Sequence, residues 1–312
     1  MKTLLTGLKP SGDLHIGNYL GTGLPDWKKW TGEYSCIFFI PDLHSLTEEF
    51  EPGDKTEQIL RVAAAILALG IDPDKCIFFR QADVLEHTNL MWIFNCITSM
   101  GQLERMTQYK DKVARKIENN NAGLFTYPVL QAADILLYEP DVVPVGIDQK
   151  QHIELTRDIA VKFNNRFGQT FKLPEPQFSD FKKVMSLTDP ESKMSKSHGE
   201  KSYIALHDEP EVIMEKMKKA VTDEVGLKNL YDLANYFIPG FDAKQYTDQN
   251  AKFKEDLAVA IADHFADFRK KRLELLAHPE NIIQILQKGA EKARAIANPK
   301  LIEAWKKIGL IG

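Results

Sequence analysis

Cysteine is scarce in this chain, which has 3 cysteines among 312 residues. Cys36, Cys76 and Cys96 are widely spaced, and no second Cys or His follows any of them at the spacing of a metal site. This pattern excludes a disulfide framework and a zinc or iron–sulfur site. We therefore expect three buried structural thiols and no metal ion held by the protein itself.

Long apolar stretches are missing as well. The longest uncharged apolar run, Val62 to Ile71, is far shorter than the roughly 20 residues that a membrane-spanning helix needs. The segment from Met1 to Leu8 is too brief for a secretory signal and leads directly into Pro10. The sequence thus predicts a cytoplasmic protein without a membrane partner.

Neither sign of charge dominates, because 40 Lys and Arg residues face 44 Asp and Glu residues. With 44% hydrophobic and 27% charged residues, the composition is that of a globular protein and excludes disordered, collagen and coiled-coil classes. Any contact with nucleic acid must then be a local patch. The one dense basic cluster is Arg269-Lys270-Lys271-Arg272. It is consistent with a solvated helix face or with a contact to RNA phosphates.

The length suggests two domains, at roughly 100–200 residues per domain. The first half alternates short β-type runs with helical patterns, which predicts a parallel sheet built from βαβ units. The candidate strands are Thr3 to Gly7, Ser35 to Ile40, Cys76 to Arg80 and Asp141 to Val145. In such α/β folds, ligands bind at the carboxyl ends of the strands.

Strand signals stop near Asp208, and amphipathic helical patterns take over. They cover Glu211 to Ala220, Phe253 to Leu276 and Glu280 to Ala297. We therefore predict an α/β protein with a Rossmann-like parallel-sheet catalytic domain over residues 1–199 and a C-terminal helical domain over residues 200–312.

The first predicted strand is followed by a turn and a helix start. The turn Leu8-Lys9-Pro10-Ser11-Gly12 leads into His15-Ile16-Gly17-Asn18, and the unpaired N–H groups of a helix N-terminus attract phosphate. His15 and Asn18 lie three residues apart and share one face of the first turn. Gly17 lacks a side chain and would let a nucleotide approach the backbone. Taken alone, the segment is equally consistent with an ordinary capped helix.

A second polar segment carries two lysines and two serines. Lys193-Met194-Ser195-Lys196-Ser197 follows the turn-forming Thr188-Asp189-Pro190. In phosphoryl or nucleotidyl transfer, negative charge develops on the phosphate oxygens, and a loop that supplies ammonium groups stabilises it. Together with the His15 turn, this segment predicts an enzyme that uses ATP.

Both segments match the signatures of a known family. A HIGH-type turn after the first strand and a KMSKS loop mark the class I aminoacyl-tRNA synthetases, which this chain resembles. Within the family it is most similar to the bacterial tryptophan enzymes. The closer similarity is carried by residues 101–110, 132–138, 143–158, 219–223 and 289–293, and thus covers nearly the whole chain.

The resemblance implies which residues contact ATP and act in catalysis. His15 and Asn18 would hold the nucleotide, and Lys193 and Lys196 would neutralise the departing pyrophosphate. Lys112 matches a family lysine near the phosphates, but is equally consistent with a surface lysine. The full set of implied ATP contacts is Lys9, Pro10, Ser11, Gly17, Asn18, Gly146, Ile147, Asp148, Val184, Lys193, Met194, Ser195, Lys196 and Ser197.

The family's indole-reading carboxylate falls on Asp134. An indole offers one polar group, its N–H donor, so an acceptor in an apolar pocket is suited to read it. Asp134 lies in Ala-Ala-Asp-Ile-Leu-Leu, an unusual place for a charge, although a structural ion pair would also explain it. The resemblance implies that Gln149 holds the amino group of the substrate. The implied tryptophan pocket also includes Leu5, His44, Tyr127, Gln131, Val143 and Val145, with packing as an alternative for His44.

Several positions depart from the family pattern. Lys9 stands where many members carry Gln, and Ile147 where an acidic residue is frequent, and both changes affect ATP contacts. Gln131 stands where many bacterial tryptophan enzymes have Met and where related archaeal-type tyrosine enzymes have Gln. Leu5 argues against tyrosine, because those tyrosine enzymes place a Tyr there to meet the substrate hydroxyl. A partly paired phenol hydroxyl in a buried pocket costs about 1–3 kcal/mol.

The resemblance therefore implies a tryptophan–tRNA ligase. The carboxylate of L-tryptophan would attack the α-phosphorus of ATP, which carries Mg²⁺, and the adenylate would then pass its aminoacyl group to the tRNA. Positioning and charge stabilisation would provide the rate without a protein nucleophile. The helical domain would read the anticodon, and the family is homodimeric. The alternatives are a tyrosine-activating synthetase, an adenylate-forming nucleotidyltransferase that does not use tRNA, and a silent tRNA-binding paralogue.

Overall fold

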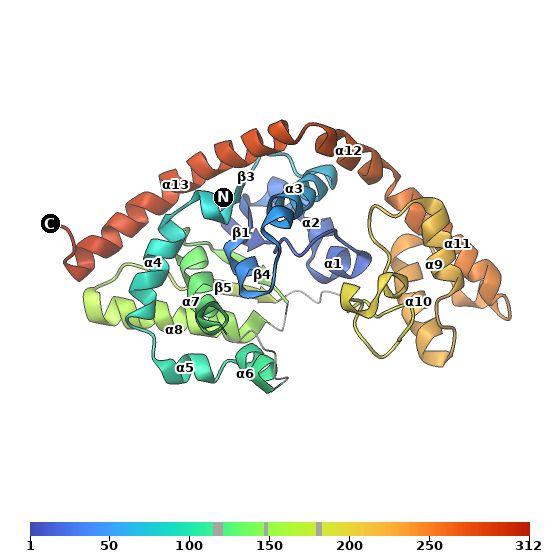
Figure 1. The fold of residues 1–312 in the computed structure, drawn as a ribbon, viewed down its shortest axis with the longest axis horizontal. Helices are drawn as coiled ribbons and strands as arrows, with labels where there is room; N and C mark the ends of the chain where they lie inside the picture. Colours follow the sequence, from blue (N-terminus) through green and yellow to red (C-terminus); the bar gives the residue numbers. More distant parts are fainter. Residues whose placement is uncertain (115–120, 147–148, 179–182) are drawn as a thin grey trace.

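The computed structural model describes residues 1–114, 121–146, 149–178 and 183–312, and these contain one five-stranded parallel sheet (Figure 1). Its order is β3-β2-β1-β4-β5, and all the strand pairs are parallel. This is the strand order of a Rossmann-type sheet. The chain adds β2 and β3 on one side of β1 and then adds β4 and β5 on the other side, so the order of the strands reverses between β1 and β4. The strands are β1 (Thr3–Gly7), β2 (Ser35–Ile40), β3 (Ile77–Arg80), β4 (Val142–Val145) and β5 (Glu175–Phe178).

The four predicted strands are confirmed, and the fifth was not foreseen. β1 and β2 have the predicted bounds, while β3 and β4 each begin one residue later than predicted. β5 has the sequence Glu-Pro-Gln-Phe and lies at the edge of the sheet beside β4. Proline cannot donate a ladder hydrogen bond and is tolerated at an edge. Pro176 therefore hid the strand from a pattern search.

Helices cover both faces of the sheet. Alternate strand residues point to opposite faces, so Leu4 is buried in one core and Leu5 in the other. The helices of this part are α1 (Ile16–Gly21), α2 (Leu24–Glu33), α3 (Pro52–Ala68), α4 (Glu86–Asn95), α5 (Met100–Glu104), α6 (Thr107–Ala114), α7 (Ala122–Leu136) and α8 (Lys150–Phe167).

The C-terminal part is helical, as predicted, but its helices separate into two groups. Helices α9 (Pro210–Lys218), α10 (Glu224–Phe237) and α11 (Asn250–His264) gather at the right of Figure 1. Helices α12 (Ala266–Ala277) and α13 (Pro279–Ile308) form an arch that leads from this group back across the sheet (Figure 1). The stretch predicted as one amphipathic unit, Phe253 to Leu276, is thus two helices that meet at Phe265.

Helix α13 packs directly on the edge strand β3. A Cβ at Gly289 would lie 1.8 Å from the carbonyl oxygen of Phe78, so the helix backbone touches the strand backbone. The helix also continues past Pro299, although a proline removes one helical hydrogen bond. Leu301 and Ala304, beyond it, are buried in the core of the sheet unit, which offsets that loss. Residues 279–308 therefore pack on the sheet, whereas α9–α11 pack on one another and contact α1, where Tyr19 lies beside Tyr236 and His264.

Two expectations about side chains need correction. Cys36 and Cys76 are buried as predicted, but Cys96 is exposed, because it forms the C-cap of α4 rather than a core position. The basic cluster is neither a fully solvated face nor a continuous patch. Arg272 is 8% exposed, and Arg269 donates to the carbonyl of Ala262, so only the two lysines between them are exposed.

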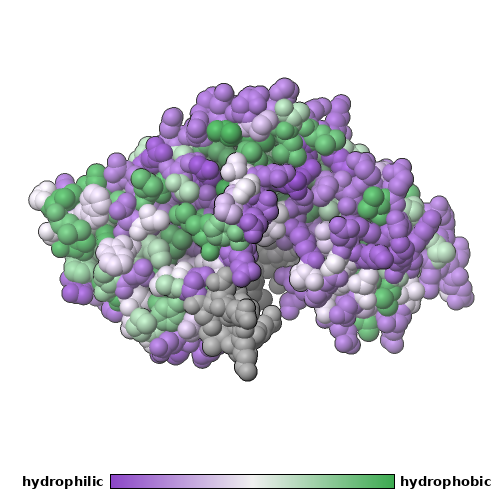
Figure 2. Space-filling model, in the orientation of Figure 1, coloured by the Kyte–Doolittle hydropathy of each residue, from purple (hydrophilic) through white to green (hydrophobic). Residues whose placement is uncertain are grey.

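The surface differs between the two parts of the molecule. Figure 2 shows mainly hydrophilic residues over α9–α11 and apolar residues gathered over the sheet unit at the left of the view. Within the part of the chain that the structure describes, none of the helices combines the length and the apolar character needed to cross a membrane.

Candidate active site

A cavity of about 530 Å³ opens at the carboxyl ends of β1 and β4, where the strand order reverses. This is the predicted place for a ligand in an α/β sheet, and the volume suits a small-molecule site. It brings together thirteen of the residues predicted from the sequence. They are Leu5, Lys9, Ser11, Asn18, His44, Tyr127, Gln131, Asp134, Val143, Val145, Gly146, Gln149 and Lys193.

One end of the cavity is formed by the N-terminus of α1. The backbone N–H of Asn18 donates to Nδ1 of His15 at 3.3 Å, and the amide oxygen of Asn18 accepts from the N–H of His15 at 3.1 Å. Burial, and then the nearby charges of Lys196 and Lys193, lower the pKa of His15 to about 4. The ring is therefore neutral near pH 7 and carries its proton on Nε2, because Nδ1 accepts. His15 thus offers a single N–H donor at a helix end suited to anions.

The predicted lysine loop lies against this turn. The ammonium of Lys196 donates to the carbonyl of Ser11 at 2.8 Å, and Lys193 lines the cavity. The backbone N–H of Met194 donates to the carbonyl of Val184 at 2.9 Å, and the Met194 side chain is buried in the core. The loop is therefore anchored by its methionine, which leaves its lysines beside the α1 turn.

Gly17 lies tightly packed between the His15 cap and the lysine loop. A Cβ at this position would lie 2.8 Å from the ring of His15 and 3.2 Å from Cβ of Met194. Gly17 does not line the cavity as described. A side chain there would push the lysine loop and the His15 cap apart, so glycine is required for this packing. Its predicted role beside the nucleotide stays a prediction.

Other predicted ATP contacts lie beside the cavity or cannot be placed. Lys9 lines it and is ion-paired with Glu48 at 2.7 Å. Ile147 and Asp148 lie outside the described residues. Lys112 belongs to α6, but its side chain is outside the described part. Seven further predicted residues are not part of the described cavity lining, namely Pro10, His15, Val184, Met194, Ser195, Lys196 and Ser197. Of these, Pro10, His15, Val184 and Met194 are buried.

The other end of the cavity holds a buried carboxylate. Asp134, on α7, is 1% exposed. Its Oδ1 accepts from Nε2 of Gln81 at 2.7 Å and from Nδ1 of His87 at 2.6 Å, and its Oδ2 accepts from Nε2 of His44 at 2.8 Å. Burial raises the pKa of Asp134, but the hydrogen bonds from His44 and His87 outweigh it and lower the pKa to about 2. Asp134 is thus ionised, and both histidines donate hydrogen bonds to it.

Several residues of this end were not predicted. Gln81 directly follows β3, so its position at a strand end was a usable signal. His87 lies in the first turn of α4 and is 0% exposed, and its Nε2 lies 2.8 Å from the hydroxyl of Tyr138. Gln108, on α6, accepts from the hydroxyl of Tyr127 at 2.6 Å. These contacts join distant segments, which sequence spacing does not reveal.

The middle of the cavity combines apolar walls with amides. Leu5 and Val143 line it from adjacent strands β1 and β4. Gln131 donates to the amide oxygen of Gln149 at 3.3 Å. These two residues of the predicted tryptophan pocket are therefore adjacent. Burial raises the pKa of Tyr127 to about 12, and this side chain therefore remains a neutral phenol. The cavity thus has polar groups at both ends of an apolar slot.

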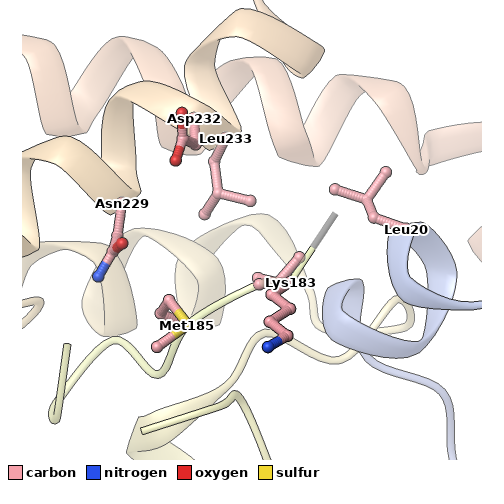
Figure 3. A pocket seen from close by; sticks show the side chains of 7 residues that line it. Leu20, Lys183, Met185, Asn229, Asp232 and Leu233 are labelled. Carbon is pink, nitrogen blue, oxygen red and sulfur yellow. The ribbon is translucent and has the colours of Figure 1, made fainter. Parts of the chain in front are cut away.

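A second, much smaller pocket lies outside this site. It has a volume of about 20 Å³, enough for a single water, and lies where α1, residues 183–185 and α10 meet (Figure 3). Asn229 of α10 borders it and donates to the carbonyl of Pro190 at 2.9 Å. Helix α10 is therefore attached to the segment that precedes the lysine loop.

The described side chains contain no group of three or more His, Cys, Asp or Glu residues that could hold a metal ion. The arrangement provides a donor-rich helix end with two lysines and, at the far end of an apolar slot, a carboxylate that can accept a hydrogen bond. It can hold an anionic phosphate group beside a flat apolar group that carries one N–H or O–H.

Comparisons with known proteins show the family to which the chain belongs. The family model described as tRNA synthetases class I (W and Y) matches residues 1–279. The chain is 43% identical to the tryptophan–tRNA ligase of Rickettsia conorii, with 99% of both chains covered. It is also 43% identical to that of Clostridium perfringens, over 99% of this chain and 98% of the relative.

The chain is also similar in structure to a solved member of this family. The tryptophanyl-tRNA synthetase of Campylobacter jejuni, complexed with ADP and tryptophan, is similar with a TM-score of 0.88 and 38% identity. The match covers 98% of this chain and 99% of that chain. The similarity therefore extends over the sheet unit and the helices that follow it.

Proposed function

The chain belongs to the class I tRNA synthetases of the tryptophan and tyrosine type, and we propose from this that it is an ATP-dependent tryptophan–tRNA ligase. The observation that carries the choice of amino acid is the buried carboxylate of Asp134, at the end of the cavity opposite the α1 turn. An indole N–H is a donor only, and a carboxylate is an acceptor only. Leu5, where a hydroxyl-binding side chain would be needed, makes tyrosine the poorer fit.

The rest of the amino-acid site follows when the indole N–H points at Asp134. The indole lies between Leu5, Val143 and Val145, and its N–H donates to Asp134. Gln149, with Gln131 beside it, then accepts from the substrate ammonium. This places the substrate carboxylate toward the α1 turn, where the nucleotide is bound.

The nucleotide site is the donor-rich end of the cavity. Asn18, Lys9, Ser11 and Gly146 line it, and neutral His15 donates from Nε2. Met194, Ser195 and Ser197 shape the lysine loop, and Val184 anchors it. Lys112, Ile147 and Asp148 belong to the same proposed set, on the resemblance alone.

In the first step the tryptophan carboxylate oxygen forms a bond to the α-phosphorus of ATP, and the bond to the pyrophosphate oxygen breaks. Lys193 and Lys196 stabilise the negative charge that the leaving pyrophosphate gains. Mg²⁺ enters with ATP and leaves with pyrophosphate. The chain itself supplies position and charge, so a nucleophilic side chain is not required.

In the second step the 2'-hydroxyl of the terminal adenosine of the tRNA attacks the carbonyl of the adenylate, and AMP leaves. We propose residues 1–199 as the catalytic domain and residues 200–312 as the part that contacts the anticodon, chiefly through α9–α11. The exposed Lys270 and Lys271 provide positive charge on that part for RNA phosphates.

We also propose that the protein is a homodimer that works in the cytoplasm. Leu85, Trp92 and Met100, along α4 and α5, have 67%, 70% and 63% of their surface exposed. Large exposed apolar side chains on neighbouring helices are typical of an interface. A mass of two chains by light scattering is the expected result.

Charging of tRNA tests the function as a whole. The protein is mixed with ATP, total tRNA and radioactive tryptophan or tyrosine, and acid-precipitable radioactivity is counted. We expect charging with tryptophan that depends on ATP. Adenylate formation without charging would instead indicate a nucleotidyltransferase that does not use tRNA, and the absence of both reactions would indicate a silent paralogue.

A further inference from the structure

His87 stands out among the groups that the proposed mechanism does not use. It is completely buried, and its two ring nitrogens contact two different partners. Nδ1 lies 2.6 Å from Oδ1 of Asp134, and Nε2 lies 2.8 Å from the hydroxyl of Tyr138. A fully buried histidine with both nitrogens engaged costs desolvation that these bonds must offset.

The carboxylate fixes the direction of one hydrogen bond, and the direction of the other then follows for a neutral ring. The carboxylate only accepts, so Nδ1 carries the proton that points at Asp134. In a neutral ring Nε2 then accepts, and Tyr138 donates its hydroxyl proton to it. The burial of Tyr138 raises its pKa, so the hydroxyl keeps that proton. Tyr138 therefore selects the tautomer of His87 that presents an N–H to the carboxylate.

The carboxylate of Asp134 needs such a contact in order to keep one orientation. Rotation of an aspartate carboxyl about its last side-chain bond is soft. Among the described side chains, Gln81 and His87 both donate to Oδ1, whereas His44 donates to Oδ2. Oδ1 is thus occupied by two donors, and Oδ2 keeps an acceptor position for a ligand in the cavity.

We propose that His87 is a positioning residue for substrate selection, which holds Asp134 so that Oδ2 accepts the N–H of the substrate side chain. This inference rests on the proposed function and concerns the same pocket. His87 does not touch the substrate, and acts only through the carboxylate.

Two substitutions separate the two nitrogens of His87. The amide nitrogen of asparagine can occupy the place of Nδ1, so His87→Asn keeps a donor to Asp134 and loses the contact with Tyr138. The amide of glutamine reaches the place of Nε2, so His87→Gln keeps a partner for Tyr138 and loses the donor to Asp134. The two variants are therefore matched controls for each other.

The readout is the ratio of two KM values in pyrophosphate exchange, one for tryptophan and one for 3-benzothienylalanine, whose sulfur replaces the indole N–H. The ratio measures what the N–H contributes. We expect His87→Gln to raise the KM for tryptophan about tenfold to a hundredfold, the loss of one hydrogen bond to a charged group. The KM for the analogue and the KM for ATP should change by less than about threefold.

The expected result for His87→Asn is a ratio close to that of the wild type. If His87→Gln raised both amino-acid KM values equally, or if both variants gave the same loss, His87 would be a packing residue and the inference would be wrong. Should the His87→Gln variant not fold, Tyr138→Phe replaces it, with an expected change of about threefold in the ratio, in the direction of weaker tryptophan binding. An unchanged ratio in Tyr138→Phe would also overturn the inference.

A wild-type protein that does not activate tryptophan would instead refute the proposed function.

Discussion

Arg272 of α12 forms an ion pair with Asp13, which lies two residues before the His15 cap of α1. Asp13 also accepts from Arg61 of α3 at 3.0 Å. The nearby charges of His207, Arg272 and Arg61 outweigh the effect of burial and lower the pKa of Asp13. A residue of the C-terminal arch is thereby connected to the turn that forms the donor-rich end of the cavity.

The two partners of this pair are not equivalent, and their removal should have unequal effects. In the described part of the chain, Asp13 is the only side chain that accepts from Arg272, whereas Asp13 keeps Arg61 when Arg272 is removed. Asp13→Asn leaves a buried guanidinium without its counter-charge and should cost about 3 kcal/mol of unfolding free energy. Arg272→Met should cost about 1 kcal/mol. Urea unfolding of both variants measures this difference, and equal losses would show that Arg272 does not depend on Asp13 in this way.

Lys196 should act mainly in the transition state. Its ammonium donates to the carbonyl of Ser11, and burial lowers the pKa of this lysine. Lys196→Ala should reduce the rate of adenylate formation about 100-fold to 1,000-fold, because charge on the leaving pyrophosphate loses a partner. The Kd of ATP should change only a few-fold. Single-turnover kinetics and calorimetry measure the two quantities.

Lys201, an exposed lysine just after the same loop, provides the control for that experiment. Lys201→Ala should leave the rate and the Kd within about twofold of the wild-type values. Equal losses of rate and ATP affinity in Lys196→Ala would contradict the transition-state role.

The depressed pKa of His15 predicts a pH-dependent stability. The pKa falls from 6.5 to about 4 in the folded chain, because burial and two lysine charges disfavour the imidazolium. Below pH 6.5 the unfolded chain therefore binds a proton that the folded chain does not, so stability falls as the pH falls from 6.5 toward 4. Between pH 7 and pH 5 this contribution is about 2 kcal/mol.

His15→Asn isolates that contribution, because asparagine is a good N-cap and does not titrate in this range. Urea unfolding at pH 7 and pH 5 should show the wild type losing about 2 kcal/mol more than the variant. Parallel losses in the two proteins would mean that His15 keeps an ordinary pKa.

Gly289 should be intolerant of any side chain. A Cβ there would lie 1.8 Å from the Phe78 carbonyl, which is backbone and cannot yield. Gly289→Ala should therefore destabilise the fold by about 3 kcal/mol or more, as α13 is forced away from β3. Gly53→Ala in α3 is the matched control, because no described atom lies within 4 Å of its Cβ. The control should gain about 0.5 kcal/mol, and a similar gain in Gly289→Ala would show that α13 does not pack as described.

Local patterns predicted most of the sheet, because each of β1 to β4 is a short β-type run with adjacent buried residues in it and turn signals around it. β5 escaped, since its register is fixed by pairing with β4 rather than by its own proline-containing sequence. The return of α13 to the sheet was also unpredictable, because helical periodicity reports an apolar face but not the surface that it covers. Gly289 becomes informative only when Phe78 is seen beside it.

The residues of the candidate site also fall into those that the sequence predicted and those that it did not. Thirteen residues of the cavity lining were predicted. A charge at Asp134 within an apolar run and a polar turn after β1 are visible in the sequence itself, whereas most of the other predicted lining residues followed only from the family resemblance. The support around Asp134 was not predictable, because Gln81 and His87 precede it by 53 and 47 residues and meet it only in the folded chain. The prediction for Cys96 was wrong for a different reason. Cysteine is usually a buried residue type, but Cys96 lies at a helix end and is exposed.

Pyrophosphate exchange into ATP, run with tryptophan and tyrosine in parallel on the wild-type chain, tests the assignment most directly. It requires no tRNA and reports both adenylate formation and the choice of side chain. We expect exchange with tryptophan and a kcat/KM for tyrosine lower by at least about 100-fold. Exchange with tyrosine at a comparable kcat/KM would contradict the role of Asp134 and Leu5 in selecting the indole, and no exchange with either amino acid would contradict the activity itself.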